Sequence, residues 1–239
     1  MNYGLQMYSV RDITEKDLVG ALKKVAEIGY KTVEFAGFFG HSAEDVKAML
    51  EENGLTVSGT HSSLDDLVKD FEGTVKYHKT IGNTNYILPS APFMTREELD
   101  DTIDKINKFQ PMLAAEGITL GYHNHDLEFL PNKDGLIAHE EMEKRTDISF
   151  QIDTFWVYYA GKDPLEVLER LKDRISVIHL KDGLTTREGR SLGEGTAPVA
   201  AVREKALELG MHMVVESESL TPDGISEVTR CFEYLKTLE

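Results

Sequence analysis

The chain has 239 residues and a formal net charge of −16 at pH 7, which suits one large domain or two small ones and argues against nucleic acid or an anionic membrane surface as a partner, because both require a basic footprint. Its single cysteine, Cys231, excludes an intrachain disulfide framework and fits a reducing compartment. The first residues, "MNYGLQMYSV", lack the features of a signal peptide, and every apolar run is far shorter than the roughly 18 residues of a membrane span, so we expect a cytoplasmic protein.

Short β-rich runs alternate with amphipathic helical runs along the chain. The strands that we expect span residues 3–8, 32–36, 56–61, 85–90, 118–123, 148–153, 176–181 and 211–217. A strand-then-helix alternation of this kind indicates a parallel sheet with crossover helices. At roughly 30 residues per unit, the pattern predicts a single-domain (β/α)8 barrel over residues 1–239.

Several helices have recognisable start signals. Thr14 and Ser42 are expected N-caps, and Thr95 with Glu98 has the spacing of a capping box. Pro111 lies inside the helix that follows Thr95 and should kink or split it. These signals place helices between the predicted strands.

A doubly wound open sheet is the alternative architecture. It would require a Gly-rich phosphate-binding turn after its first strand. The residues found there, "YSVRD", do not form such a turn. The sequence therefore favours the barrel.

The segment 64–82 gives mixed signals and has no clear helical pattern.

Polar residues gather at the predicted carboxyl ends of the strands, where barrels of this kind have their active sites. In "GYHNHDLEF" (121–129), His123 and His125 lie two residues apart, so both side chains would point the same way from a strand. The predicted strands five to eight carry, at or near their ends and in this order, His123, Asp153, His179 and Glu216. Two imidazoles and two carboxylates are ligands expected for Mn²⁺, Fe²⁺, Co²⁺ or Zn²⁺. Since buried carboxylates are costly unless paired or metal-bound, the pattern indicates a metal site.

Five stretches, taken in order, resemble the sugar phosphate isomerase/epimerase superfamily of xylose isomerase-like barrels: "LQMYSVRD", "YHNHDLEF", "QIDTFW", "HLKD" and "VVESE". The resemblance runs from the first predicted strand to the last. It implies one divalent metal ion bound at the ends of strands five to eight, at the positions of His123, Asp153, His179 and Glu216. We expect Mn²⁺ first, with Zn²⁺, Co²⁺, Fe²⁺ and Mg²⁺ as alternatives.

His123 departs from the most common pattern of the superfamily, in which a glutamate occupies this position. It resembles the "YHNH" subset that includes inosose dehydratase-like members. In the ketose 3-epimerases of the superfamily, two metal-bound glutamates face each other across the substrate. Here Glu216 is left as one base, and His125 or Lys181 would serve as the other catalytic acid or base.

The resemblance implies a metal-dependent isomerase or epimerase of a small keto-sugar, which removes a proton next to the carbonyl and forms a metal-stabilised enediolate. The alternative is a dehydratase or lyase of the inosose or 3-keto-glycoside type. A non-catalytic, sugar-sensing barrel would have a degraded ligand set, and an endonuclease would need a basic surface. Members are often dimers or tetramers, so a homo-oligomer is possible.

Five further residues near the predicted strand ends are candidates for substrate contact: His61, Glu34, Tyr8, Trp156 and Glu194. His61 could instead be a core or helix-capping histidine, and Glu34 could form a salt bridge with Arg11. Trp156 could pack under the barrel rim, and the glycines around Glu194 could simply form a tight turn. Arg187 and Arg190, in the same loop as Glu194, could bind a phosphate. No Gly-rich phosphate cradle accompanies them, so we see no sign of a phosphorylated substrate.

Overall fold

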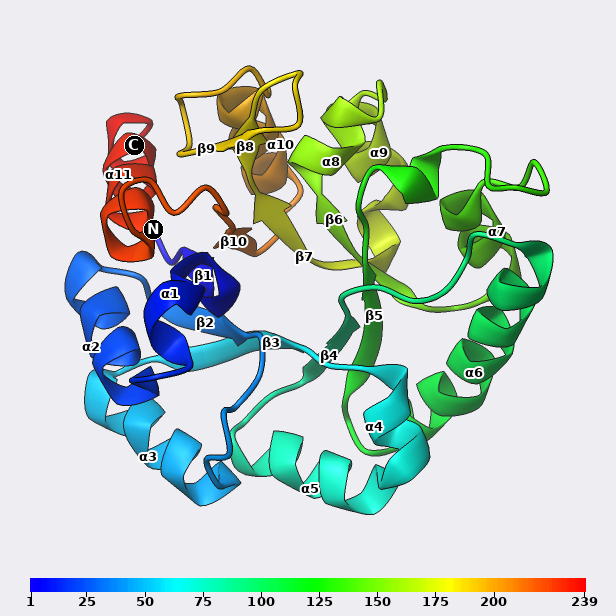
Figure 1. The fold of residues 1–239 in the computed structure, drawn as a ribbon, viewed down its shortest axis with the longest axis horizontal. Coiled ribbons are helices and arrows are strands. Elements are labelled where there is room, and N and C mark those ends of the chain that lie inside the picture. Colours follow the sequence, from blue (N-terminus) through cyan, green and yellow to red (C-terminus); the bar gives the residue numbers. More distant parts are fainter.

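The computed structural model describes residues 1–239 apart from the side chain of Ser176. Across this described chain, eight parallel strands close a barrel in the order β1-β10-β7-β6-β5-β4-β3-β2 (Figure 1). The strands are β1 Gly4–Gln6, β2 Thr32–Phe35, β3 Thr56–His61, β4 Asn85–Leu88, β5 Thr119–His123, β6 Ser149–Asp153, β7 Ile175–Leu180 and β10 Met213–Val215. The predicted single-domain (β/α)8 barrel is confirmed, and the open-sheet alternative is wrong.

Helices connect successive strands and form a ring around the barrel (Figure 1). They are η1 Met7–Val10, α1 Arg11–Thr14, α2 Leu18–Ile28, α3 Ala43–Asn53, α4 Leu64–Lys69, α5 Phe71–Thr80, α6 Arg96–Ala115, η2 Leu127–Phe129, α7 Ala138–Arg145, α8 Thr154–Tyr159, α9 Pro164–Leu171, η3 Lys172–Arg174, α10 Val199–Glu208 and α11 Gly224–Thr237. A small antiparallel hairpin of β8 Asp182–Gly183 and β9 Gly189–Arg190 follows β7 and was not predicted. In the described chain, no helix combines the length and apolar character needed to cross a membrane.

The predicted helix starts are partly correct. Ser42 caps α3, and Thr95 opens α6 with the expected capping box. Thr14 is wrong as the cap of α2, because this helix starts after Asp17, whose carboxylate accepts a hydrogen bond from a backbone N–H three residues on at 2.8 Å. Thr14 instead ends the short helix α1. Pro111 does not split α6, which runs as one helix through this position.

The ambiguous segment 64–82 forms two short helices rather than one. Asp70 ends α4 and also caps α5, where its carboxylate accepts from the backbone N–H of Gly73 at 3.0 Å. Its φ of −154° and ψ of 84° are not helical, so the chain turns at this residue. As a result α4 lies inward of α5, next to the barrel mouth (Figure 1).

The alternation of side chains along the strands sends polar groups into the barrel. In β6, Phe150 packs on the outside, where its ring stacks on His139 of α7 at 4.6 Å between centroids. Gln151 and Asp153 are buried as well, and Gln151 bonds to Glu34 of β2 across the barrel. Because successive side chains of a strand point to opposite faces, the inner positions of neighbouring strands face one another.

Candidate metal centre

Four side chains from different strands converge at the carboxyl end of the barrel. Each offers one ligand atom, and these atoms all lie within 4.8 Å of one another. We call them the ligand cluster: His123 of β5, Asp153 of β6, His179 of β7 and Glu216, which directly follows β10. The register of the sheet, which pairs Asp153 with His179, brings them to one level. All four are buried, with at most 4% of their surface exposed. The structure thus brings together the residues that the sequence pattern singled out.

His179 is oriented by carboxylates on both sides of its ring. Its Nε2 lies 2.7 Å from Oε1 of Glu34, and its Nδ1 lies 3.3 Å from Oε2 of Glu216. Burial alone would lower the pKa of His179, but Glu34 and Glu216 outweigh it and raise this pKa to about 10. If Nε2–H is kept on Glu34, Nδ1 faces the cluster, and a cation that binds there must displace the proton from Nδ1.

The donor chemistry of the cluster fits a divalent cation. Oδ2 of Asp153 is buried and has no hydrogen-bond partner among the described residues, and burial raises the pKa of this carboxyl to about 6. Burial, with His179 and His61 nearby, lowers the pKa of His123 well below its usual value, so this ring is neutral. Neutral imidazoles and carboxylate oxygens are ligands of divalent transition metals. An orphaned buried oxygen between them is the atom that a cation would bind.

Glu34 lies beneath the ligand cluster and is fully buried. It accepts hydrogen bonds from the amides of Gln6 at 2.6 Å and Gln151 at 2.5 Å, besides its contact with His179. Burial would raise the pKa of Glu34, but His179 and His61 lower it well below its usual value. A carboxylate held in this way fixes the orientation of a ligand histidine.

Lys181, the last polar residue of the "HLK" stretch, lies beside the cluster. Its Nζ donates to Oε2 of Glu216 at 3.0 Å, contacts the carboxylate of Glu218 and lies 3.7 Å from Oδ2 of Asp153. Burial would lower the pKa of Lys181, but Glu216 and Asp153 outweigh it and raise this pKa above its usual value. The side chain is therefore an ammonium held by the carboxylates of Glu216 and Glu218.

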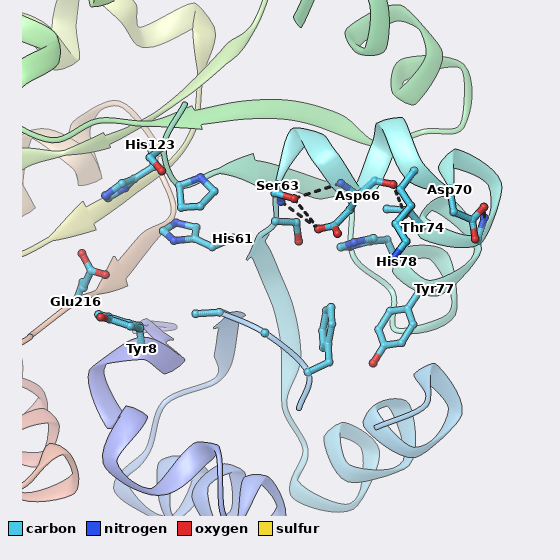
Figure 2. A pocket seen from close by; sticks show the side chains of 18 of the residues that line it. Tyr8, His61, Ser63, Asp66, Asp70, Thr74, Tyr77, His78, His123 and Glu216 are labelled. Atoms are coloured by element: carbon cyan, nitrogen blue, oxygen red, sulfur yellow. Dashed lines mark hydrogen bonds between the residues drawn. The ribbon is translucent and has the colours of Figure 1, made fainter. Parts of the chain in front are cut away.

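A cavity of about 940 Å³ opens from the ligand cluster. Figure 2 shows His123, Glu216, Tyr8 and His61 at one end of it. The cavity then extends past Ser63 toward α4 and α5. Buried ligands at one end and an open approach at the other are the arrangement expected of an enzyme site.

A model of the xylose isomerase-like TIM barrel family matches residues 22–235. The chain belongs to this family. A curated relative, inosose dehydratase from Geobacillus kaustophilus, is 23% identical over 186 residues, which cover 67% of this chain and 60% of the relative. The match thus spans less than two thirds of the relative's length. The predicted resemblance is confirmed.

Solved structures of the family have the same fold. A sugar phosphate isomerase/epimerase from Parabacteroides distasonis superposes with a TM-score of 0.84 at 26% identity, over 98% of this chain and 97% of that one. An L-ribulose 3-epimerase superposes with a TM-score of 0.74 at 16% identity, over 100% of this chain and 94% of that one. The second likeness concerns the fold alone.

His125, which the family resemblance places beside the substrate, lies at the rim of the site. Its side chain lines the cavity and is 40% exposed. The ring centroid lies 4.9 Å from that of His123 and 5.8 Å from that of Trp156. Burial would lower the pKa of His125, but the carboxylate of Glu128 outweighs it and raises this pKa.

His61 and Tyr8 also line the cavity. Nε2 of His61 lies 2.7 Å from the amide oxygen of Gln151 and 3.1 Å from Oε1 of Glu34, so the ring is tied to the network beneath the cluster. The ring of Tyr8 carries the Arg11 guanidinium 4.4 Å from its centroid. The expected alternative of a Glu34–Arg11 salt bridge is wrong, because Arg11 donates to the carbonyls of Tyr8 and Glu218 instead.

Trp156 and Glu194 are placed differently. Neither is among the described residues that line the cavity. Trp156 packs behind the site, with the Lys181 ammonium 4.8 Å from its ring centroid. Glu194 lies in the turn after β9 and pairs with Arg230 of α11 at 3.1 Å. The structure thus gives both residues supporting contacts in place of an open position in the cavity.

Three residues of the site were not predicted to have a role. Gln151 and Gln6 hold Glu34, and Glu218 contacts Lys181. Gln151 and Glu218 each lie two residues from a ligand candidate along the chain. The two-residue period of a strand was the signal that could have identified Gln151.

Proposed function

We propose that the protein is a divalent-metal-dependent enzyme that isomerises or epimerises a small keto-sugar. The observation that carries the proposal is the buried ligand cluster with the Lys181 ammonium bonded to one of its members. A cation held by the cluster, with Mn²⁺ our first choice, would act as a Lewis acid toward the sugar carbonyl. The residues of the chain then have to move the protons.

Glu216 is the base in this proposal. Burial would raise the pKa of Glu216, but Lys181 and His179 outweigh it and hold this pKa well below its usual value, so the side chain is a carboxylate. It accepts the proton from the carbon next to the carbonyl. Lys181 or His125 then donates a proton. Donation to the other face of the same carbon gives an epimer. Donation to the neighbouring carbon gives an isomer, provided that the proton of the adjacent hydroxyl passes to the former carbonyl oxygen.

A dehydratase or lyase is the second candidate function, favoured by His123. The resemblance puts this residue at the place of the first of the two metal-bound glutamates of the ketose 3-epimerases. A curated relative is, in addition, named inosose dehydratase. In this reaction Glu216 removes the same proton, and the electrons of the broken C–H bond form a carbon–carbon double bond. The C–O bond on the next carbon breaks, and the departing oxygen takes a proton from Lys181 or His125. Water or an alcohol is released.

The deciding experiment is proton NMR in D₂O on protein loaded with Mg²⁺ or Zn²⁺, because Mn²⁺ would broaden the signals. The panel comprises free ketoses, inososes and 3-keto-glucosides. Deuterium next to the carbonyl of a new sugar, with no change of composition apart from the label, supports the isomerase or epimerase. A vinylic proton or a released alcohol supports the lyase. If the panel shows neither exchange nor product, the proposal is wrong.

A further inference from the structure

The cavity is larger than a small keto-sugar requires. Its volume of about 940 Å³ lies near the upper end of the roughly 300–1,000 Å³ found for sites that bind drug-sized ligands. A single sugar ring is smaller than such a ligand. The chemistry needs only the end that holds His123, Glu216 and His125. The rest of the volume is available to another part of the substrate.

The additional volume lies in one direction, toward the connection between β3 and β4. We call this part the distal arm; its lining includes Phe38, Ser63, Asp66, Asp70, Thr74 and Tyr77. Figure 2 shows Asp66, Asp70, Thr74 and Tyr77 on the opposite side of the cavity from His123 and Glu216, with Ser63 between the two ends. The arm exists because the connection is broken at Asp70, which places α4 at the barrel mouth.

Two aromatic rings form a fixed wall in the distal arm. The centroids of Phe38 and Tyr77 lie 4.5 Å apart with an interplanar angle of 41°. Phe38 also packs on Phe35 at 5.3 Å, and the Tyr77 hydroxyl donates to the carbonyl of His41 at 2.9 Å. Rings held in this way offer an apolar face at little entropic cost, and the C–H face of a sugar ring can pack against it.

The charges of the distal arm disfavour an anionic group. Among the described residues the arm has two carboxylates, Asp66 and Asp70, against the one ammonium of Lys69. The other two carboxylates of the cavity lining, Glu216 and Glu218, lie at the opposite end and are paired with Lys181. A phosphate in the arm would be repelled by Asp66 and Asp70. Sugar hydroxyls, in contrast, can donate hydrogen bonds to these carboxylates.

We propose that the substrate is a keto-glycoside, with its keto ring at the ligand cluster and a second, uncharged sugar unit in the distal arm. The position of the keto ring rests on the proposed function. The second unit rests on the volume, the aromatic wall and the charges of the arm. The proposed role of the distal arm can therefore be tested by measuring binding affinity, without measuring turnover.

The test is calorimetric titration of the metal-loaded protein with a 3-keto-disaccharide, methyl 3-keto-glucoside and a ketose phosphate. We expect the disaccharide to bind at least about tenfold tighter than the methyl glycoside, which corresponds to about 1.4 kcal/mol. The ketose phosphate should bind more weakly than either. Equal affinities for the disaccharide and the methyl glycoside would overturn the proposal.

A matched pair of variants locates the second unit. Phe38→Ala removes the aromatic wall, and Phe39→Ala removes a neighbouring ring that is 42% exposed and is not among the described residues of the cavity lining. We expect Phe38→Ala to reduce the tenfold advantage of the disaccharide to less than about threefold, and Phe39→Ala to preserve it. Asp66→Asn, at an exposed position, should also reduce it and serves if Phe38→Ala does not fold. An unchanged advantage in both would overturn the proposal.

Two other results have defined meanings. An aryl 3-keto-glucoside that binds tighter than the disaccharide would replace the sugar unit by an aromatic one and overturn the assignment. If no ketose exchanges deuterium while the disaccharide advantage depends on Phe38, the proposed function fails and the distal arm stands. If the protein turns over a ketose but binds the disaccharide no tighter than the methyl glycoside, the proposed function stands and the proposal for the distal arm is wrong.

Discussion

The two sides of the barrel mouth differ in how they treat charge. The side built by β5, β6, β7 and β10 holds the ligand cluster and Lys181 out of water, where His179 pairs with Glu34 of β2 and Lys181 pairs with Glu216. The side built by the loop after β2 and by α4 and α5 holds Asp66, Lys69 and Asp70 in the open. Buried charges keep a fixed geometry but depend on their partners, whereas exposed charges adapt. The first side suits chemistry, and the second suits recognition.

The largest expected effect comes from His179→Ala on the buried side. The variant removes a ligand and the partner of Glu34, so we expect loss of bound metal together with a drop in turnover of at least about 10³-fold. Elemental analysis should find about one divalent metal ion per chain in the wild type and almost none in the variant. His212→Ala is the control, because His212 bonds Thr32 at the other end of β10. Full activity without metal would contradict the site.

Lys181→Met should separate binding from chemistry. The variant removes the ammonium that bonds Glu216 and leaves the ligand cluster intact, so metal content should stay near one per chain. We expect turnover to fall about 10²–10⁴-fold, the range for a lost general acid. Near-normal turnover would remove Lys181 from the mechanism. The measurement is metal content and steady-state kinetics on the same preparation.

Glu34→Gln tests whether the buried side depends on its support. The amide keeps the size of the side chain but loses the charge that faces Nε2 of His179. We expect metal affinity to fall about 10–100-fold. Competition with a chelator measures this affinity without any substrate. An unchanged affinity would mean that the ligand cluster is held in place by packing alone.

The last prediction concerns stability rather than activity, and its residue is His78, which lines the cavity on the recognition side. Burial lowers the pKa of His78 to about 4, whereas an unfolded histidine has a pKa near 6.5. As pH falls below about 6.5 the unfolded chain binds the proton first, so stability is lost progressively down to about pH 4. We expect His78 to account for about 2–3 kcal/mol of the loss between pH 7 and 4.5.

Urea denaturation of the wild type and of His78→Gln at these two pH values measures the contribution. Gln cannot titrate, so the variant should lose about 2–3 kcal/mol less than the wild type over this interval. Because His78 is far from the ligand cluster in Figure 2, metal content should not differ. An identical pH dependence in both proteins would mean that the pKa of His78 is not lowered in the folded protein.

The fold and the ligand cluster could be predicted because both follow from periodicity. Strand ends mark one edge of the barrel, and the two-residue period brings His123 and His179 to the inner face. Two partners of Glu34, Gln151 and His179, could not be predicted, because they lie on strands far apart in sequence and reach it only across the closed barrel. Gln6 is different, because it lies opposite Glu34 on the neighbouring strand β1. The prediction of substrate contact did not place the loop residue Glu194 for a related reason. The direction of a loop side chain depends on tertiary contacts, which for Glu194 are with Arg230.

The carboxylate-rich cavity also has a kinetic consequence. A concave site with low-dielectric walls concentrates its own field, and the chain as a whole carries −16 at pH 7, so a divalent cation is steered toward the opening. The rate of metal loading should therefore decline as ionic strength rises and the Debye length shortens. The same field repels a polyanionic chelator, which slows stripping of the bound ion. The negative charge of the chain would thus help the site to retain its cation when an anionic chelator competes for it.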